Sequence, residues 1–278
     1  MARKALCIGI NNYPGTDMDL RGCVNDAEDW LAELTTRGYA VQKLTDAQAT
    51  KAAMVAAIRA LVGGAASGDS VVITYSGHGT YAPDENGDEP DGLDEGLCPY
   101  DIKQGNVLID DEIHQLFAQR AAGVRILLIS DSCHSGTVIR AAPADPQADA
   151  SRPRFMPMGA WLPESKLPRA ANGKPATQVA ITSTLSPWAG ALALGSGFDL
   201  LLSGCAEGPN NFSYDATISG RPNGAFTYYA LKALKRMKST STYADWHAEI
   251  RNSLPSGSYP QTPQLFGSKA ARRNKIFA

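Results

Sequence analysis

The chain has 278 residues, a formal net charge of −2, 44% hydrophobic and 19% charged residues. This balance is typical of a globular protein with a sizeable core, and it excludes the strong positive charge that would attract nucleic acid or an anionic membrane. The five cysteines are widely spaced and form no C-x-x-C pair, which argues against a disulfide framework or a zinc site. The apolar run after Lys4 is too short for a signal peptide or a membrane span, so we expect a cytoplasmic protein.

The first part of the chain alternates predicted strands and helices. Residues 4–10 predict a buried strand, and Asn25 is the expected cap of the helix that follows. A strand over 39–44 and a helix over 50–62, capped by Thr50, come next. Strands that alternate with helices predict a parallel α/β sheet with right-handed crossovers.

Two later buried strands end in short polar turns. Residues 70–75 lead into His78, which has a glycine on each side, and residues 126–130 lead into Cys133. The carboxyl ends of parallel strands border the crevice where open α/β sheets bind ligands, so we expect both side chains there. Flanking glycines indicate a close backbone approach. A thiol beside an imidazole is a nucleophile with its base, and the pattern therefore predicts a cysteine peptidase.

Each of these residues also has a plainer interpretation. A lone cysteine after a strand is more often inert core, and a lone histidine is more often a satisfied loop residue. The neighbours of Cys133 are small and polar, however, and the backbone N–H groups of the predicted turn would lower a thiol pKa. His134 is a rival base, but adjacent side chains at a strand end point apart, so we expect it to face away.

The remaining chain contains two segments of unusual composition. Residues 84–95 are acidic and predict a surface loop, and residues 140–175 are rich in proline and basic residues and predict an exposed, partly disordered linker. The other expected elements are a helix from Asp110 to about residue 121, strands over 179–185 and 198–203, helices over 225–237 and 243–254, and a sheet-edge strand over 260–266.

Several short motifs resemble those of the metacaspases, the caspase-like cysteine peptidases of bacteria, plants, fungi and protists. They are Y-S-G-H-G (75–79), D-S-C-H-S-G (131–136), R-G-C-V-N-D-A (21–27), S-G-C (203–205) and Q-T-P-Q (261–264). The animal-caspase motif Q-A-C-x-G is absent, which favours the metacaspase or bacterial orthocaspase branch. The resemblance implies a caspase-like fold, with a six-stranded, mostly parallel sheet flanked by helices on both faces.

The resemblance also implies a single peptidase domain over residues 1–278. Its large-subunit-like region would end at about residue 139, the linker would occupy about 140–175, and a small-subunit-like region would fill about 176–278. Cys133 would attack a peptide carbonyl, and His78 would protonate the leaving amine and then activate water. The backbone N–H groups of Gly79 and Cys133 would form the oxyanion hole.

Cleavage after Arg or Lys is implied as well, through an acidic pocket. The residues that match this substrate-binding pocket are Cys23, Asp26, Ser76 and Asp131. Two carboxylates that face a cationic side chain suit the guanidinium fork. The plainer alternatives are that Asp26 complements a helix dipole and that Asp131 forms a local Asx turn.

Calcium is an open question for this sequence. Many metacaspases are calcium-activated, and Asp94, Asp110 and Asp111 match three of the usual metal positions, but Arg140 occupies the fourth. An arginine where a hard cation needs an oxygen is an objection. We therefore expect no required cofactor and leave Ca²⁺ as an alternative to a solvated acidic loop.

The linker invites self-cleavage, although an ordinary tolerated insertion is an equal alternative. The candidate sites are Arg140, Arg152, Arg154, Lys166, Arg169 and Lys174. The expected partners are polypeptides with exposed Arg or Lys, with no nucleic acid and no membrane, and the resemblance implies a monomer. Two other functions stay open: a caspase-like interaction module with little turnover, and a peptide ligase, since water and an amine attack the same thioester.

Overall fold

A six-stranded sheet crosses the molecule in the order β12-β9-β7-β3-β1-β2. This computed structural model describes residues 1–84, 87, 92–133, 151–168, 199–206 and 211–278. The strands are β1 (Arg3–Gly9), β2 (Ala40–Thr45), β3 (Ser70–Ser76), β7 (Arg125–Asp131), β9 (Leu200–Ser203) and β12 (Gln264–Gly267). Every neighbouring pair is parallel except the edge strand β12 against β9. The predicted mostly parallel, six-stranded sheet is confirmed.

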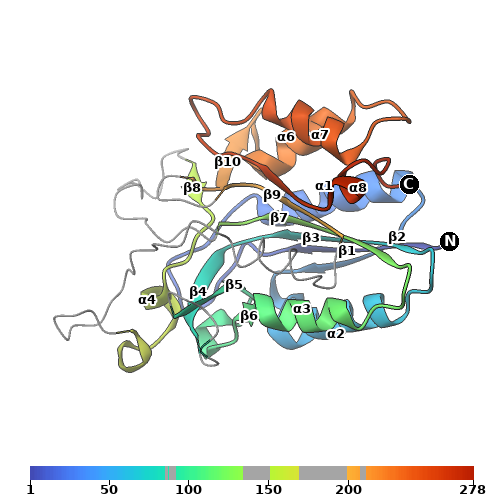
Figure 1. Cartoon of the computed structure of the whole chain (residues 1–278). Helices are drawn as coiled ribbons and strands as arrows, with labels where there is room; N and C mark the ends of the chain where they lie inside the picture. Colours follow the sequence, from blue (N-terminus) through green and yellow to red (C-terminus); the bar gives the residue numbers. More distant parts are fainter. Residues whose placement is uncertain (85–86, 88–91, 134–150, 169–198, 207–210) are drawn as a thin grey trace.

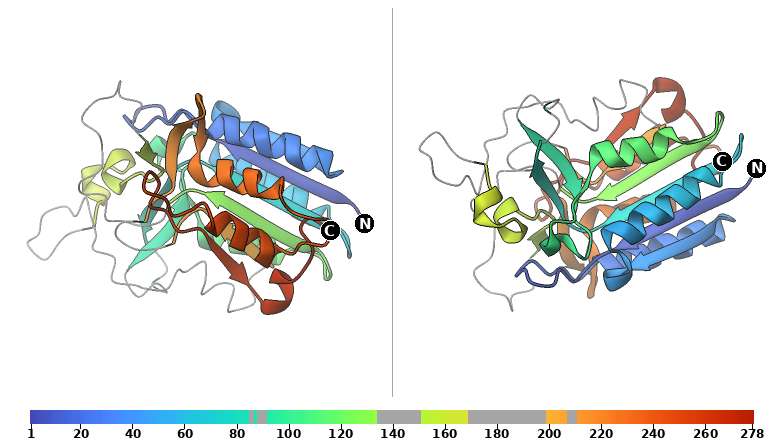
Figure 2. Two further views of the ribbon diagram at one scale, coloured as in Figure 1. Left: turned by 90° about the horizontal axis from the view of Figure 1, so that it is seen from above. Right: turned by 90° about the horizontal axis from the view of Figure 1, so that it is seen from below.

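Helices cover both faces of this sheet (Figures 1 and 2). One face carries α1 (Cys23–Thr36), α6 (Ala225–Leu234), α7 (Tyr243–Arg251) and α8 (Lys269–Arg272), and the other carries α2 (Lys51–Gly63) and α3 (Asp110–Ala118). Successive side chains of a strand point to opposite faces. Leu6 of β1 therefore packs into the core beneath α2 and α3, while its neighbours Ala5 and Cys7 pack into the core beneath α1 and α6. Burial on both faces explains why these strands read as continuous apolar runs.

The two predicted helix caps have different outcomes. The Oγ1 atom of Thr50 accepts the N–H of Ala53 at 3.3 Å, so the cap of α2 is confirmed. Asn25 does not cap α1, because the helix begins at Cys23 and Asn25 lies in its first turn. The Oδ1 atom of Asn11 instead accepts the N–H of Cys23 at 2.8 Å. A cap supplied by a distant residue leaves no local pattern in the sequence.

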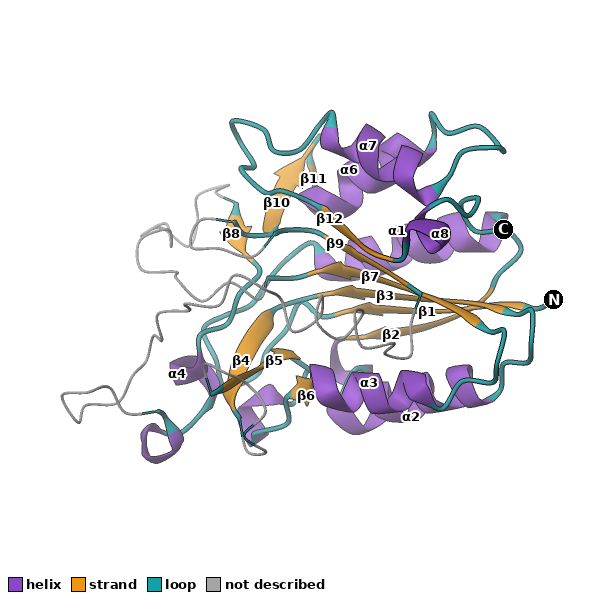
Figure 3. Ribbon diagram, viewed as in Figure 1, coloured by secondary structure: helices purple, strands orange, loops and turns teal. Residues whose placement is uncertain are grey.

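Two small antiparallel sheets lie at the carboxyl ends of the central strands, and neither was predicted (Figure 3). One contains β4 (Gly79–Pro83), β5 (Leu93–Leu97) and β6 (Leu108–Ile109). The other contains β8 (Arg152–Pro153), β10 (Tyr214–Ile218) and β11 (Arg221–Gly224). Together with α4 (Met158–Trp161) they surround the end of the sheet that lies opposite the chain termini (Figure 1).

Both segments of unusual composition contain buried structure, so their expected exposure is wrong in part. Residues 93–95 of the acidic segment belong to β5, where Asp94 and Glu95 are buried. Within the basic segment, Arg154 and Met156 are completely buried. Polarity and proline content are local signals, and they predicted exposure. They missed the burial because the strands that cover these residues are distant in the sequence. The strand expected over 179–185 lies outside the described residues, and α3, α6 and α7 end three residues before their predicted ends.

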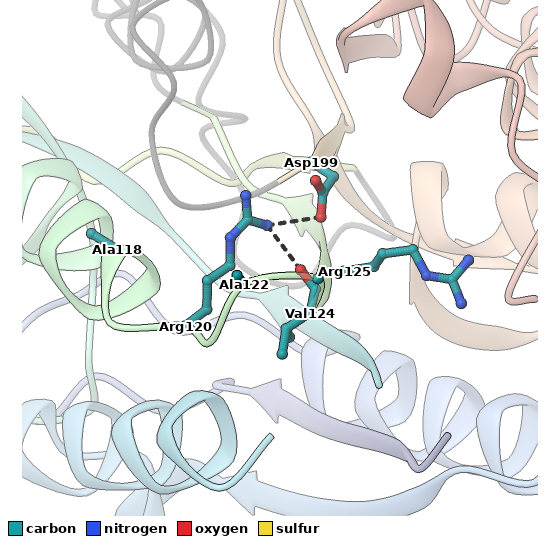
Figure 4. A pocket seen from close by; sticks show the side chains of 7 residues that line it. Ala118, Arg120, Ala122, Val124, Arg125 and Asp199 are labelled. Carbon is teal, nitrogen blue, oxygen red and sulfur yellow. Dashed lines mark hydrogen bonds and ion pairs between the residues drawn. The ribbon is translucent and has the colours of Figure 1, made fainter. Parts of the chain in front are cut away.

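A surface pocket opens near the start of β7, at the end of the sheet away from His78 and Cys133 (Figure 4). Nη1 of Arg120 contacts Oδ2 of Asp199 at 2.8 Å and the carbonyl oxygen of Val124 at 3.2 Å. The same Asp199 oxygen accepts the N–H of Ile126. These contacts tie the starts of β7 and β9 together. Among the described residues, no helix is long and apolar enough to cross a membrane.

Candidate active site

Two adjacent strands carry the predicted nucleophile and base to one end of the sheet. β3 and β7 pair in register through Ser76 and Asp131 at their carboxyl ends. His78 and Cys133 follow directly, and both are buried, with exposed fractions of 1% and 0%. The parallel register therefore brings the two strand ends together, as the sequence predicted.

His78 is held in one orientation by its surroundings. Its Nε2 atom lies 2.6 Å from the carbonyl oxygen of Met18. A carbonyl only accepts hydrogen bonds, so Nε2 carries the proton in the neutral ring and Nδ1 keeps its lone pair. Nδ1 is buried and has no hydrogen-bond partner among the described residues. A side chain on Gly77 would place Cβ 2.7 Å from the hydroxyl of Tyr13, which itself accepts the backbone N–H of His78.

The backbone N–H groups of Gly79 and Cys133 point at one carbonyl oxygen. They donate to the oxygen of Arg154 at 3.0 and 3.1 Å. The thiol of Cys133 contacts the backbone of Ser213, whose N–H donates to Sγ at 2.6 Å. Two N–H donors that converge on a carbonyl beside a thiol are the geometry that stabilises a tetrahedral oxyanion.

The residues around Arg154 cross this site as an extended strand. On the amino side, β8 pairs with β10 through Pro153 and Tyr214, and the N–H of Arg154 donates to the carbonyl of Ser213 at 2.8 Å. On the carboxyl side, the N–H of Met156 donates to the carbonyl of Gly79 at 2.8 Å. The carbonyl between the two N–H donors therefore belongs to the Arg154–Phe155 peptide bond.

The side chain of Arg154 fills a closed acidic pocket. Its Nη2 atom contacts Oδ2 of Asp26 at 2.7 Å and Oδ1 of Asp215 at 2.9 Å. Its Nη1 atom contacts Oδ2 of Asp131 at 3.1 Å and Oγ of Ser76 at 2.9 Å. The structure thus brings together Asp26, Asp131 and Ser76, three of the four residues expected to line a pocket. The fourth, Cys23, is buried and close enough to interact electrostatically with Arg154.

Asp215 was missed by sequence reasoning. It lies on β10, far along the chain from the motifs, and belongs to none of them. Its two carboxylate oxygens accept the N–H groups of Arg21 and Gly22 at 2.8 and 2.9 Å. Those donors precede α1, so Asp215 joins the hairpin to the segment that carries Asp26. Only the tertiary pairing reveals this third carboxylate.

The other two carboxylates are held by the start of α6. The N–H of Gly224 donates to Asp26 at 2.9 Å, and the N–H and hydroxyl of Thr227 donate to Asp131 at 2.9 and 2.6 Å. A Cβ atom on Gly224 would collide with Oδ2 of Asp131 and lie 2.5 Å from Nη1 of Arg154, so the pocket requires glycine at this position. Asp26 also lies in the first turn of α1, so its expected helix-dipole role is compatible with these contacts.

Burial governs the protonation of the site. It lowers the pKa of His78 to about 4, an effect that the carbonyl of Met18 partly offsets. It also raises the pKa of the Cys133 thiol well above its usual value. Burial raises the pKa of Asp131 too, against the attraction of Arg154. The closed site therefore holds a neutral thiol and a neutral imidazole.

The other motif residues support the same end of the sheet. The side-chain amide of Gln261 is buried, donates to the carbonyl of Gly204 at 2.9 Å and accepts the N–H of Tyr214 at 3.3 Å. The thiol of Cys205 donates to the carbonyl of Ser132 at 3.4 Å. The S-G-C motif thus contacts the turn that carries Cys133, and Gln261 of the Q-T-P-Q motif joins the end of β9 to β10.

A family model described as the metacaspase peptidase C14 domain matches residues 3–142. Metacaspase-1A of Aspergillus clavatus is 33% identical, and the match covers 99% of this chain and 68% of that protein. Metacaspase-1 of Saccharomyces cerevisiae is 31% identical, with 96% and 66% covered. The chain belongs to the metacaspase family. Metacaspases are cysteine peptidases, which is the class of enzyme that the motifs predicted.

Solved structures agree with this fold. A protein of Geobacter sulfurreducens superposes with a TM-score of 0.71 at 30% identity, covering 100% of this metacaspase and 99% of that chain. Caspase-1 of Spodoptera frugiperda superposes with a TM-score of 0.57 at 11% identity, covering 96% and 86%. At that identity the second likeness shows the fold alone. The expected caspase-like fold is confirmed.

The remaining candidates in this metacaspase have different positions. Arg152 lies on β8 and donates to the carbonyl of Asp19 at 3.1 Å, and Lys166 is exposed. Arg140, Arg169 and Lys174, together with the rival base His134, lie outside the described residues. Of the six self-cleavage candidates, the described part of the chain therefore brings only Arg154 into the site.

The calcium candidates form no ligand set within the described chain. Asp94 and Asp110 are buried and Asp111 is half-buried. No group of three or more His, Cys, Asp or Glu side chains among the described residues is arranged to hold a metal ion. The expectation that no cofactor is required stays a prediction, with Ca²⁺ as the alternative.

Proposed function

We propose that this metacaspase is an endopeptidase that cleaves after arginine, with Cys133 as nucleophile and His78 as base. Its first substrate is its own Arg154–Phe155 bond. The observation that supports this is the position of Arg154. Its side chain lies among three carboxylates and its carbonyl oxygen lies between two N–H donors. A substrate arginine would need both contacts at once.

The reaction begins when Nδ1 of His78 takes the thiol proton of Cys133 and Sγ attacks the carbonyl carbon of Arg154. The N–H groups of Gly79 and Cys133 hold the resulting oxyanion, each such donor being worth roughly 3 kcal/mol. His78 then gives its proton to the nitrogen of Phe155, and the C–N bond breaks to leave a thioester. Water, deprotonated by His78, cleaves the thioester, which releases the carboxylate of Arg154 and restores the thiol.

The pocket favours arginine over lysine. Nη1 and Nη2 of Arg154 each contact different oxygens, on opposite prongs of the fork. The ammonium group of lysine is a single point charge, so it cannot contact both sets of oxygens at once. We therefore expect arginine substrates to be cleaved faster than lysine substrates, although both are accepted.

The intact chain would be closed to other substrates. Arg154 occupies the pocket that a substrate arginine needs, and it has no exposed surface. Cleavage and withdrawal of the carboxyl end at Arg154 would open the pocket to water and to other polypeptides. This metacaspase would thus be made as a zymogen.

The test is intact-mass analysis and N-terminal sequencing of the purified chain over time. We expect a new N-terminus at Phe155 in the wild type and no cut in Cys133→Ala or His78→Gln. Arg154→Gln removes this cut, while Lys166→Gln, a change at an exposed basic residue of the same segment, leaves it. A cut after Arg154 that persists in Cys133→Ala would overturn the proposal.

Specificity is tested in trans with coumarin amides of peptides ending in Arg, Lys or Asp. We expect turnover in the order Arg, then Lys, with none after Asp, and loss of all turnover in Cys133→Ala. Cleavage after Asp would sink the assignment of the acidic pocket. A chelator lane tests the calcium prediction in the same experiment.

A further inference from the structure

The residue that follows the proposed scissile bond is buried as deeply as a core residue. Phe155 is 6% exposed, and its ring centroid lies 6.0 Å from that of Tyr81 at an interplanar angle of 60°. It belongs to an apolar cluster with Leu93 of β5 and with Met158 and Leu167 of its own segment. This cluster is separate from the acidic pocket that holds Arg154.

Strand β4 holds the backbone on both sides of the bond. The N–H of Gly79 donates to the carbonyl of Arg154, and the carbonyl of Gly79 accepts the N–H of Met156. Oγ1 of Thr80 then donates to the carbonyl of Met156 at 2.7 Å. Residues 154–156 therefore lie beside β4 as an added parallel strand. In peptide recognition of this kind, main-chain hydrogen bonds give affinity and side-chain pockets give specificity.

We infer that Tyr81 and Leu93 form a second specificity site, which selects a large apolar or aromatic residue directly after the cleaved arginine. This inference rests on the proposed function, because it takes the Arg154–Phe155 bond as the bond that is cut. The occupant is the polypeptide substrate, and the chain's own Phe155 is its example. Tyr81 and Leu93 act here as specificity residues, in the same apolar cluster as Cys133.

The physical reason is the apolar surface that the site would otherwise expose. Tyr81 and Leu93 are 5% and 3% exposed while the segment covers them. When Phe155 leaves this position, a substrate phenylalanine restores the apolar contact with Tyr81. An alanine covers less of this surface, and an aspartate must lose its hydration without a compensating partner.

The test uses the self-processed chain and internally quenched peptides that span residues 151–158. One peptide keeps phenylalanine after the arginine, and the others carry leucine, alanine or aspartate there. We expect kcat/KM to fall about tenfold from phenylalanine to alanine and further to aspartate, with leucine between phenylalanine and alanine. In Tyr81→Ala the phenylalanine-to-alanine ratio falls toward one, whereas Tyr81→Phe keeps it. Tyr228→Ala, an aromatic truncation on α6, keeps the wild-type ratio.

A peptide that ends in arginine coumarin amide separates the two claims, because it has no amino acid after the arginine. If this amide is cleaved while the phenylalanine and alanine peptides are cut equally, the second site is overturned and the proposed function stands. An unchanged ratio in Tyr81→Ala would also overturn the inference. If neither the amide nor any peptide is cleaved, the proposed function falls and this inference with it.

Discussion

Arg154 carries one positive charge into a space that it shares with the carboxylates of Asp26, Asp131 and Asp215. Burial alone would lower the pKa of this guanidinium, but the surrounding acids, Asp131 foremost, raise it well above its usual value. The group therefore stays charged. Buried charges of this kind contribute little to stability as a set, yet removal of one partner leaves the others uncompensated.

We expect Arg154→Met to lower the free energy of unfolding by about 3–5 kcal/mol when both proteins also carry Cys133→Ala to prevent cleavage. Arg154→Lys, which keeps the charge, should lose less. Urea unfolding measures the difference, with Arg152→Met at the half-buried neighbouring arginine as the matched control. An Arg154→Met protein as stable as its parent would mean that the carboxylates do not depend on the guanidinium.

His78 makes stability depend on pH. Its pKa is lowered from 6.5 to about 4 in the folded chain, chiefly by burial. Between these values the unfolded chain binds a proton that the folded chain does not, so stability falls as pH drops from about 6.5 to about 4. The loss amounts to about 3 kcal/mol. In the Cys133→Ala background, adding His78→Gln should remove that part of the slope in unfolding experiments across this range, and an identical slope would contradict the assignment.

At the scale of elements, the hairpin of β10 and β11 and the first turn of α6 shape the arginine pocket. Asp215 belongs to β10, and Gly224 ends β11. The central strands supply Ser76 and Asp131, so the pocket forms only where the hairpin meets the sheet. A pocket assembled from separate elements is sensitive to any atom added at their junction.

Gly224→Ala adds such an atom, since its Cβ would collide with Oδ2 of Asp131 and lie 2.5 Å from Nη1 of the bound arginine. We expect kcat/KM for arginine coumarin amides to fall roughly 10- to 100-fold, the usual cost of a misfit of about one carbon in a substrate pocket. The matched control is Gly257→Ala, where a Cβ meets nothing within 4 Å. Equal activity of both variants would mean that the substrate arginine does not pass Gly224.

At the scale of the whole molecule, the Arg154–Phe155 bond divides the chain without dividing the sheet. β7 precedes this bond and β9 follows it, and the two strands pair in parallel along Leu127–Leu200 to Ser130–Ser203. Trp30 of α1, which precedes the bond, packs in one core with Phe226 and Trp246, which follow it. The two products therefore share one sheet and one core.

We expect the cleaved protein to remain one particle. Separation would expose the hydrogen-bonding edges of β7 and β9 and the apolar core beside them. Native mass spectrometry should give the mass of the whole chain plus one water, while denaturing electrophoresis should show two bands. A Cys133→Ala sample should give the mass of the uncut chain in the first measurement and a single band in the second. Release of either fragment under native conditions would show that the cut disrupts the fold.

The sequence by itself determined the central strands, the mostly parallel character of their sheet and the family. Apolar runs and helical spacing are local signals, and they predicted the central strands and five of the six described helices that cover the sheet, all but the short α8. The motifs around His78 and Cys133 predicted two strand ends, which the register of β3 and β7 brings together. Proline confined the last segment to the edge, where β12 lies.

Only the tertiary structure decided which basic residue enters the site and what surrounds it. Arg154 is one of six basic candidates in the proline-rich segment, and it is distinguished by the pairing of β8 with β10 and by contact with β4. Asp215 and Tyr81 likewise belong to the small sheets, whose strands no periodic pattern of polar and apolar residues predicted. The physical reason is that strand pairing between distant segments depends on their joint packing, which a local pattern of polarity does not encode.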